Sequence, residues 1–270
     1  MRLGWITDIH LNFLNIADRR RFLESVREQV DALVISGDIA ESNSIGEMLR
    51  QIEAWLERPV YFVLGNHDCY RGSVAGTRAN VAEMVNGAKN LVYLSRAGIV
   101  ELTPHTCLVG HDGWADARLG DYDRSDVIVN DFLLIDELRC WKDPHTLDKP
   151  ALRRALQTLG DEAAGYLQGL LSQAAERYPN VVVATHVPPF REAAWHQGRP
   201  SGDDYLPYFS CKAVGDVLLA VAKSHPACQL LVLCGHTHGG GEVQVLENLR
   251  VVTGPAEYGK PQIQQIFDIE

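Results

Sequence analysis

The stretch Val60-Tyr61-Phe62-Val63-Leu64-Gly65-Asn66-His67-Asp68 joins a short apolar run to a cluster of polar residues. An apolar run of this length, rich in β-branched and aromatic residues, is typical of a buried strand. The polar cluster follows at the carboxyl end of the strand, which is where open α/β sheets bind their ligands. The stretch therefore predicts a strand that delivers reactive side chains to one edge of a sheet.

The same pattern recurs on both sides of this stretch. Upstream, strands predicted at 3–6 and 32–36 end in Thr7-Asp8-Ile9-His10 and Gly37-Asp38, and helices are predicted over 18–29 and 45–56. Strands that alternate with helices indicate βαβ units and a parallel sheet. Downstream, strands predicted at 181–184 and 230–233 precede His186 and Gly235-His236-Thr237-His238. Strand ends along most of the chain therefore carry Asp, Asn or His side chains.

The remaining segments complete the expected organisation. The sequence predicts short strands at 91–94, 98–102 and 106–109 in a hairpin arrangement, helices over 149–177 and 212–224, and two or three strands within 242–270. We interpret residues 1–270 as a single domain with inserts at about 110–180 and 190–210. The inserts either form a cap over the site or pack on a core of their own.

Charge and hydropathy exclude several classes of protein. The 270 residues carry a formal net charge of −10 and no basic block, which argues against broad nucleic-acid binding because phosphate contacts need clustered Lys and Arg. No apolar run approaches the roughly 20 residues that a membrane helix needs. We therefore expect a soluble, cytoplasmic protein with no membrane partner, and the sequence leaves the oligomeric state open.

The strand ends offer a set of metal-binding side chains: Asp8, His10, Asp38, Asn66, His186, His236 and His238. Carboxylate, amide and imidazole donors together suit manganese, iron or zinc. Residues i and i+2 of an extended segment point the same way, so Asp8 with His10, and His236 with His238, can each direct two side chains to one site. The set is too large for one ion with an open position, and it suits two ions that share a bridging carboxylate.

In their order along the chain, Asp8-x-His10, Gly37-Asp38, Gly65-Asn66-His67-Asp68, His186 and Gly235-His236-Thr237-His238 resemble the motifs of calcineurin-like metallophosphoesterases. The resemblance runs from Asp8 to His238. It implies an α/β fold, the four-layer α-β-β-α sandwich of two mixed sheets flanked by helices. It also implies that Asp8, His10 and His238 bind one ion, that Asn66, His186 and His236 bind the other, and that Asp38 bridges both.

The resemblance further implies a hydrolase in which two divalent or trivalent transition-metal ions (Mn, Fe or Zn) activate hydroxide for in-line attack on a phosphoryl group. Asp38 and His67 are then catalytic, and both Asn66 and His67 contact the substrate. His67 is expected to protonate or stabilise the leaving oxygen.

Near these residues the match to related protein Ser/Thr phosphatases loosens. Glu41 stands where those enzymes have an Asp, and it either orients His67 as a catalytic carboxylate or is an ordinary exposed residue. Ser42 replaces an Arg, which puts protein phosphatase activity in doubt. Asp68 replaces a Glu, and either supports the site or caps the turn.

Substrate choice is expected to depend on the inserts. His111 and Asp112 follow directly after a predicted strand, and they either reach the substrate or belong to a solvated loop. Arg191 lies among aromatic residues in the second insert, where it either holds the substrate or belongs to a cap that packs on its own core.

We therefore expect a phosphatase or phosphodiesterase that acts on a small soluble phosphoester, either a phosphomonoester or a nucleotide-like diester. A nuclease acting on nucleic-acid ends and a non-catalytic metal-binding scaffold of the same fold are the alternatives. The complete set of ligands favours an enzyme over a scaffold.

Overall fold

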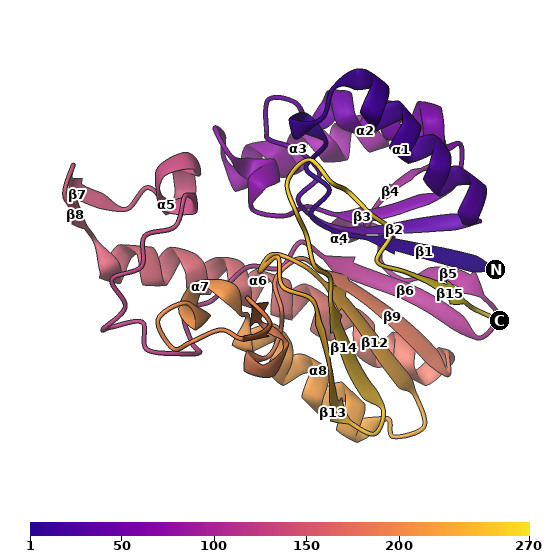
Figure 1. Cartoon of the computed structure of the whole chain (residues 1–270). Helices are drawn as coiled ribbons and strands as arrows, with labels where there is room; N and C mark the ends of the chain where they lie inside the picture. Colours follow the sequence, from indigo (N-terminus) through magenta and orange to yellow (C-terminus); the bar gives the residue numbers. More distant parts are fainter.

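The computed structural model describes all 270 residues, and its centre is a pair of facing β-sheets (Figure 1). The five-stranded sheet has the order β15-β1-β2-β3-β4, with strands Gln265–Asp268, Arg2–Ile6, Ala32–Ser36, Val60–Val63 and Leu91–Tyr93. The six-stranded sheet has the order β13-β14-β12-β9-β6-β5, with strands Gly241–Leu246, Leu249–Thr253, Gln229–Cys234, Asn180–Thr185, Thr106–His111 and Val100–Thr103.

Both sheets are mixed. Strands β1 to β4 are parallel and β15 joins β1 antiparallel, with Trp5 opposite Gln265. In the second sheet β6, β9, β12 and β14 are parallel, while β5 and β13 pair antiparallel at the two edges. The parallel strands of each sheet therefore end at the same edge, which is where the polar clusters of the sequence are placed.

The alternation of side chains along each strand builds the layers. Trp5 and Val34 belong to the apolar core between the two sheets, whereas their neighbours Ile6 and Ile35 pack toward the helices of the first sheet. In β9, Val182 packs between the sheets and Val183 packs toward the helices of the second. Because both faces are covered, these strands are apolar on both sides.

Helices cover the outer face of each sheet (Figure 1). The first sheet is covered by α1 (Ile16–Gln29), α2 (Ile45–Leu56) and α3 (Val74–Val85), and the second by α6 (Lys149–Arg177) and α8 (Lys212–Ser224). Helix α6 begins where the side chain of Asp148 accepts a hydrogen bond from the backbone N–H of Ala151, an ordinary N-cap. The expected four-layer α-β-β-α arrangement is confirmed.

The inserts contain several short elements and one long helix. Between β6 and β9 lie α5 (Asp131–Leu134), a 3₁₀ helix (Asp136–Leu138), the hairpin β7–β8 (Trp141–Asp143 and Thr146–Leu147) and the long helix α6. Between β9 and α8 lie a 3₁₀ helix (Arg191–Ala193), the hairpin β10–β11 (Trp195–His196 and Arg199–Pro200) and α7 (Leu206–Phe209). The two inserts share one apolar cluster, in which Phe132 of the first meets Tyr208 of the second. They pack beside each other at one end of the sandwich.

One expectation about the elements is wrong, and the structure adds two features to the others. The segment 91–94 does not join a hairpin with 98–102, because β4 lies at the edge of the first sheet, parallel to β3, and is followed by the short helix α4 (Leu94–Ala97). Only β5 and β6 form the expected hairpin. Helix α3 lacks a sequence prediction altogether. The tail contains three strands, of which β15 leaves the second sheet and joins the first.

Candidate metal centre

The structure brings together all seven side chains that the sequence nominated as ligands. Asp8 and His10 follow β1, Asp38 follows β2, and Asn66 follows β3, all in the first sheet. His186 follows β9, and His236 and His238 follow β12, both in the second sheet. The ligands therefore converge from the carboxyl ends of strands in both sheets, at one end of the sandwich.

The backbone at these strand ends adopts an uncommon conformation. Positive φ angles of 49°, 40°, 53°, 69° and 57° occur at Asp8, His10, Asp38, His236 and His238. Non-glycine residues rarely enter this left-handed region, and when they do they cluster at functional sites. Five of the seven nominated ligands share the feature, so local backbone strain coincides with the site.

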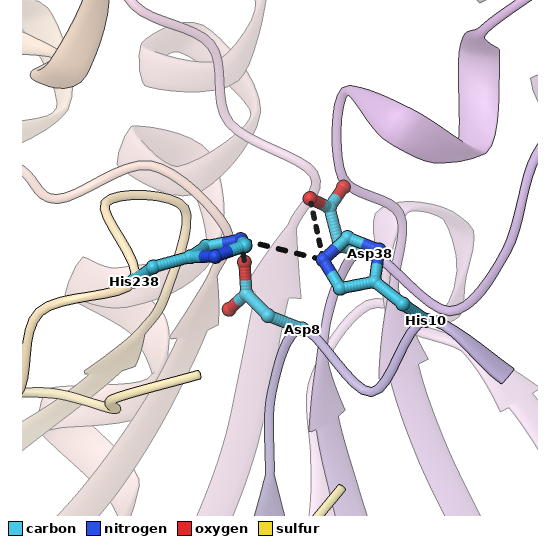
Figure 2. A group of neighbouring side chains, drawn as sticks. All are labelled: Asp8, His10, Asp38 and His238. Carbon is cyan, nitrogen blue, oxygen red and sulfur yellow. Dashed lines mark hydrogen bonds and ion pairs between the residues drawn. The ribbon is translucent and has the colours of Figure 1, made fainter. Parts of the chain in front are cut away.

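One group of donors consists of Asp8, His10, Asp38 and His238, whose ligand atoms all lie within 4.8 Å of one another (Figure 2). His238 Nε2 lies 3.4 Å from Asp8 Oδ1, and His10 Nε2 lies 3.8 Å from Asp38 Oδ2. The two imidazole nitrogens also face each other, since His10 Nε2 and His238 Nε2 are 3.3 Å apart. Lone pairs of nitrogen and oxygen aimed at one point are the arrangement that binds a cation.

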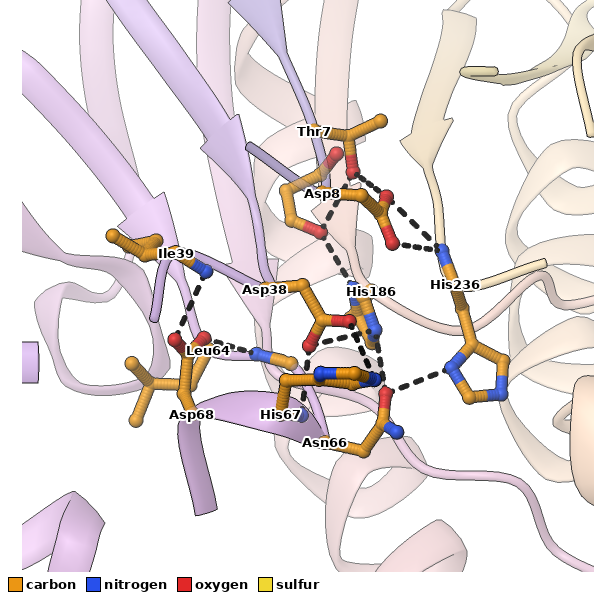
Figure 3. Close-up of polar contacts among 12 residues, drawn as sticks. Thr7, Asp8, Asp38, Ile39, Leu64, Asn66, His67, Asp68, His186 and His236 are labelled. Carbon is orange, nitrogen blue, oxygen red and sulfur yellow. Dashed lines mark hydrogen bonds and ion pairs between the residues drawn. The ribbon is translucent and has the colours of Figure 1, made fainter. Parts of the chain in front are cut away.

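A second group of donors lies on the other side of Asp38 (Figure 3). Asn66 Oδ1 lies 2.9 Å from His186 Nε2 and 2.9 Å from His236 Nδ1. His186 Nε2 is also 3.4 Å from Asp38 Oδ1. Asp38 thus presents Oδ1 to the second group and Oδ2 to His10 of the first, which is how a bridging carboxylate would be placed.

The outer nitrogens of two histidines are held by backbone carbonyls. His186 Nδ1 lies 2.9 Å from the carbonyl oxygen of Ser36, and His236 Nε2 lies 2.9 Å from that of Tyr208. A carbonyl oxygen can only accept, so each of these nitrogens carries the proton. His186 Nε2 and His236 Nδ1 are left unprotonated and available as ligands.

The amide of Asn66 is held in one orientation by neighbours that the sequence did not reveal. Asn66 Nδ2 donates a hydrogen bond to Asp131 Oδ1 at 2.8 Å, and the hydroxyl of Tyr70 donates to the same oxygen at 2.8 Å. These contacts turn the amide oxygen toward the two histidines. Asp131 belongs to α5 of the first insert, so that insert supports the site directly.

Backbone N–H groups fix the loops that carry the ligands. Asp68 accepts a hydrogen bond from the backbone nitrogen of Ile39 at 2.9 Å (Figure 3). It also accepts from the backbone nitrogens of Ala40 and Gly65 at 2.7 and 2.8 Å. This carboxylate therefore ties the loop after β2 to the loop after β3, which is the turn-capping alternative raised from the sequence. A Cβ at Gly65 would meet Asp38 Oδ1 and, at 2.7 Å, His186 Cε1, so only glycine allows this close approach.

The electrostatics of the site favour a bound cation. Burial, followed by the charges of Asp8 and Asp68, raises the pKa of Asp38 well above its ordinary value. Burial lowers the pKa of His10 and of His236 to about 4, so both rings are neutral near pH 7. The ionised form of Asp38 is destabilised by the neighbouring carboxylates, and the neutral imidazoles supply no positive charge to offset this. Bound metal ions would supply that positive charge. The donors therefore fit a pair of transition-metal ions.

His67 lies beside the ligands without joining either group. Its ring stacks on Tyr70 with centroids 4.1 Å apart, and its Nε2 is 3.9 Å from Asp38 Oδ2. Its backbone N–H donates to Asp38 Oδ1 at 2.9 Å, which locks the loop to Asp38. Burial lowers the pKa of His67 to about 2 in the metal-free protein, so the ring is neutral and its N–H is free to act as a donor.

Four other nominated residues are not brought to the ligands. Glu41 accepts a hydrogen bond from Arg71 Nε at 2.8 Å instead of contacting His67. His111 and Asp112 are buried, in contrast to the expectation that they reach the substrate or lie in a solvated loop. Arg191 pairs with Asp203 at 2.6 Å.

Asp112 has a structural role that explains its position. It accepts hydrogen bonds from the backbone nitrogen of Leu64 at 2.8 Å, from Arg78 at 2.8 Å and from the hydroxyl of Tyr93 at 2.6 Å. The carboxylate therefore fastens the end of β3 to α3 and β4. Its hydrogen bonds hold the strand that precedes Asn66, and the carboxylate does not face the ligand cavity.

A cavity of about 320 Å³ opens over the ligands. Its floor includes Asn66, His67, His236 and His238, and its walls come from the two inserts and from the segment after β14. Arg191, His111 and Asp112 do not line it. Tyr258, which the sequence analysis did not nominate, does line it. No local pattern marked Tyr258 or Asp131, because both act through contacts made only in the folded chain.

A helix–sheet–sheet–helix sandwich with carboxylate, amide and imidazole donors converging from both sheets defines a metal-binding α/β protein. The chain belongs to the calcineurin-like phosphoesterase family, whose model matches residues 1–240. This match confirms the resemblance drawn from the motifs. No curated protein matches the sequence. No helix of the chain combines the length and the apolar character needed to cross a membrane.

Solved structures share the fold at low sequence identity. A phosphopantetheinyl hydrolase from Mycobacterium tuberculosis is 14% identical, covers 95% of this chain and 89% of its own, and superposes with a TM-score of 0.67. A dimetal phosphatase from Danio rerio is 17% identical, with coverage of 94% and 87% and a TM-score of 0.59. A protein from Thermus thermophilus is 14% identical, with coverage of 94% and 88% and a TM-score of 0.54. At these identities the likeness is one of fold.

Proposed function

We propose that the chain is a metal-dependent phosphoester hydrolase, a phosphatase or phosphodiesterase, acting on a small phosphoester. The observation that carries the proposal is the position of Asp38, whose two carboxylate oxygens face two separate groups of donors. Membership of the calcineurin-like phosphoesterase family supports it. Two proteins of similar fold, a phosphopantetheinyl hydrolase and a dimetal phosphatase, agree by name with this class of reaction.

In this proposal each group of donors holds one ion, of manganese, iron or zinc. The first ion would be held by Asp8, His10, Asp38 and His238, and the second by Asp38, Asn66, His186 and His236. When bound, two such ions lower the pKa of a coordinated water and polarise the phosphoryl oxygens.

Side chains around the two groups of donors orient His67 and Asn66 and provide a hydrogen-bond donor for the substrate. His67 lies at the cavity floor with a neutral ring, so its N–H can donate a hydrogen bond to a phosphoryl oxygen or to the departing oxygen and stabilise the charge that develops there. The stack on Tyr70 and the hydrogen bond from the His67 backbone to Asp38 hold the ring there. Asp131 keeps the amide oxygen of Asn66 directed at the second group.

We also propose that the chain is a single domain in which the inserts 110–180 and 190–210 cap the cavity. Val129 and Asp131 of the first insert line it, as do His196, Tyr208 and Phe209 of the second. A cavity of about 320 Å³ is near the lower end of the range for small-molecule pockets. Its size supports a small substrate rather than a polymer.

The test begins with protein stripped of metal by a chelator and then reloaded with manganese, iron or zinc. We expect reloading to restore hydrolysis of an aryl phosphate monoester or diester, with no cleavage of a labelled oligonucleotide at physiological salt. Asp38→Asn should abolish turnover, and His67→Ala should lower kcat by about 100-fold or more because it removes a hydrogen-bond donor to the reacting oxygens. His145→Ala, at an exposed histidine in the turn of the β7–β8 hairpin, is the matched control.

Two results would overturn the proposal. One is the absence of hydrolysis with every metal while the protein binds the ions stoichiometrically, which would indicate a scaffold. The other is turnover that Asp38→Asn leaves intact.

A further inference from the structure

The segment 254–264, which we call the strap, connects β14 of the second sheet to β15 of the first and passes the end of the sandwich that holds the ligands (Figure 1). At one end the backbone nitrogen of Ala256 donates to the carbonyl of His238 at 3.3 Å. At the other, the backbone nitrogen of Gln264 donates to the carbonyl of Trp5 at 2.9 Å. The strap is therefore anchored to a nominated ligand loop and to β1.

Between these anchors the strap places one aromatic ring over the metal centre. The ring centroid of Tyr258 lies 4.6 Å from that of His10, 5.0 Å from that of His238 and 6.1 Å from that of His67. It also lies 4.9 Å from the ring of Phe13. Tyr258 is 47% exposed and Phe13 is 54% exposed. Two aromatic rings thus lie open to solvent immediately beside the donors.

The lining contributed by the inserts is also apolar and aromatic. Phe209 of the second insert meets the ring of His236 edge to face at 5.5 Å, and His196 lies 5.9 Å from Phe209. Ile128 and Val129 of the first insert also belong to this lining. A flat group entering the cavity would therefore meet aromatic and aliphatic surface, which favours an organic ring over a flexible polar chain.

The cavity offers no cation besides the metal centre. None of its lining residues is Lys or Arg. The cation of the strap, Lys260, pairs with Glu257 at 2.6 Å, and Arg191 pairs with Asp203. The one carboxylate in the lining, Asp131, is occupied by Asn66 and Tyr70. A second phosphate or a carboxylate on the substrate would have no charged partner there.

We infer that the cavity selects phosphoesters whose alcohol part carries a planar, uncharged ring seated against Tyr258, and that it disfavours substrates with a second anionic group. The inference rests on the proposed function, because the phosphoryl group must lie at the metal centre. An aryl-substituted alcohol and a nucleoside both supply such a ring. Tyr258 is then a residue that determines specificity, and its ring, not its hydroxyl, carries the effect.

The experiment measures binding and turnover separately on the manganese-loaded protein. Calorimetry compares phenylphosphonate with methylphosphonate and with 4-carboxyphenylphosphonate. Kinetics compare 2-phenylethyl phosphate and adenosine 5′-monophosphate with propyl phosphate, all esters of aliphatic alcohols, so that intrinsic leaving-group reactivity changes little. The variants are Tyr258→Ala and Tyr258→Phe, with Ile266→Ala, on β15 away from the ligand cavity, as the matched control.

We expect phenylphosphonate to bind about tenfold more tightly than methylphosphonate, as one stacked ring would give. It should also bind about tenfold more tightly than its carboxylated analogue, because the added charge finds no cationic partner in the cavity. The ratio of kcat/KM for a ring-bearing ester over propyl phosphate should fall about tenfold in Tyr258→Ala and stay unchanged in Tyr258→Phe and Ile266→Ala. A preference for the phenylethyl ester identifies an aryl-substituted alcohol, and a preference for the nucleotide identifies a nucleoside.

Equal binding of the phenyl and methyl phosphonates, or a ring preference that survives Tyr258→Ala, overturns the inference while propyl phosphate is still hydrolysed. Loss of all metal-dependent hydrolysis, propyl phosphate included, instead overturns the proposed function.

Discussion

The carboxylate of Asp131 accepts a hydrogen bond from the amide nitrogen of Asn66 at 2.8 Å. Because this contact turns the amide oxygen toward His186 and His236, Asp131 positions a donor that it does not itself supply. Removing such a neighbour of a metal ligand typically costs about 10–100-fold in metal affinity. We expect Asp131→Ala to weaken binding of one of two manganese ions by that factor, measured by calorimetry.

The control for this prediction is Asp136→Ala, since Asp136 lies in the same insert but forms an exposed ion pair with Arg139. Asp136→Ala should bind both ions normally. Asp131→Asn retains an acceptor oxygen and should recover part of the lost affinity. Normal binding of two ions by Asp131→Ala would show that Asn66 holds its orientation without this contact.

Asp38→Asn should separate stability from function. In the metal-free protein, burial and the neighbouring charges of Asp8 and Asp68 disfavour the ionised carboxyl, as its raised pKa indicates. An amide of the same shape removes that charge and can still accept the hydrogen bond from the backbone of His67. We expect the metal-free variant to gain about 1 kcal/mol, or about 2–4 °C in Tm.

The same substitution should also remove most of the stabilisation that manganese gives to the protein, because the shared ligand is lost. Thermal unfolding with and without the metal measures both effects. A variant that is destabilised without metal, or still stabilised by manganese as the native protein is, contradicts this account.

Much of the fold follows from local sequence patterns. The bounds predicted for the helices Lys149–Arg177 and Lys212–Ser224 agree with α6 and α8, because both segments carry long helical periodicity and α6 has a side-chain cap at Asp148. Helix α3 was missed because apolar residues are spread around it, so no single face stands out. The pairing of β15 with β1 also has no local signal, since it joins residues from the two ends of the chain.

In the site too, some residues could be predicted from local sequence patterns and others could not. The nominated ligands could be found because each follows a strand end and the residue types agree with one chemistry. Asp112 and Arg191 carry suitable groups as well, but Arg78 and Asp203 respectively engage them in the folded chain. Asp131 and Tyr258 act across contacts between segments distant in sequence, which no spacing rule reveals. Local patterns therefore predict donors, while tertiary contacts decide which donors face the site.

The metal-free protein should lose stability on acidification. Burial lowers the pKa of a set of histidines, to about 4 in two cases: His10, His67, His111, His186 and His236. Their ordinary value is 6.5, so the unfolded chain takes up protons below that pH while the folded chain does not. Asp38 and Asp68 act in the opposite sense, because burial raises their pKa values and the folded chain binds those protons.

Three of these histidines have pKa values of about 4 or below in the folded chain, against two carboxyl groups of opposite sign, so unfolding near pH 5 takes up about one net proton. The free energy of unfolding should then fall by about 1.4 kcal/mol for each pH unit of acidification. Denaturant titrations in a chelator at a series of pH values measure this slope. His10→Asn, which cannot take up the proton, should reduce it. A flat or inverted dependence would rule out neutral buried histidines.

Gly65 and Gly165 should respond in opposite ways to the same added methyl group. At Gly65 a Cβ would meet Asp38 Oδ1 and His186 Cε1, so Gly65→Ala must displace groups that bind metal. Overpacking of this kind costs about 1–3 kcal/mol, and manganese affinity should fall with it.

At Gly165, in the middle of α6, a Cβ meets nothing within 4 Å. Gly165→Ala should therefore stabilise the protein by about 0.5–1 kcal/mol and leave manganese binding unchanged. Urea unfolding and calorimetry on both variants test the pair, and Gly65→Ala with native stability and native affinity would show that the loop after β3 can move away from Asp38.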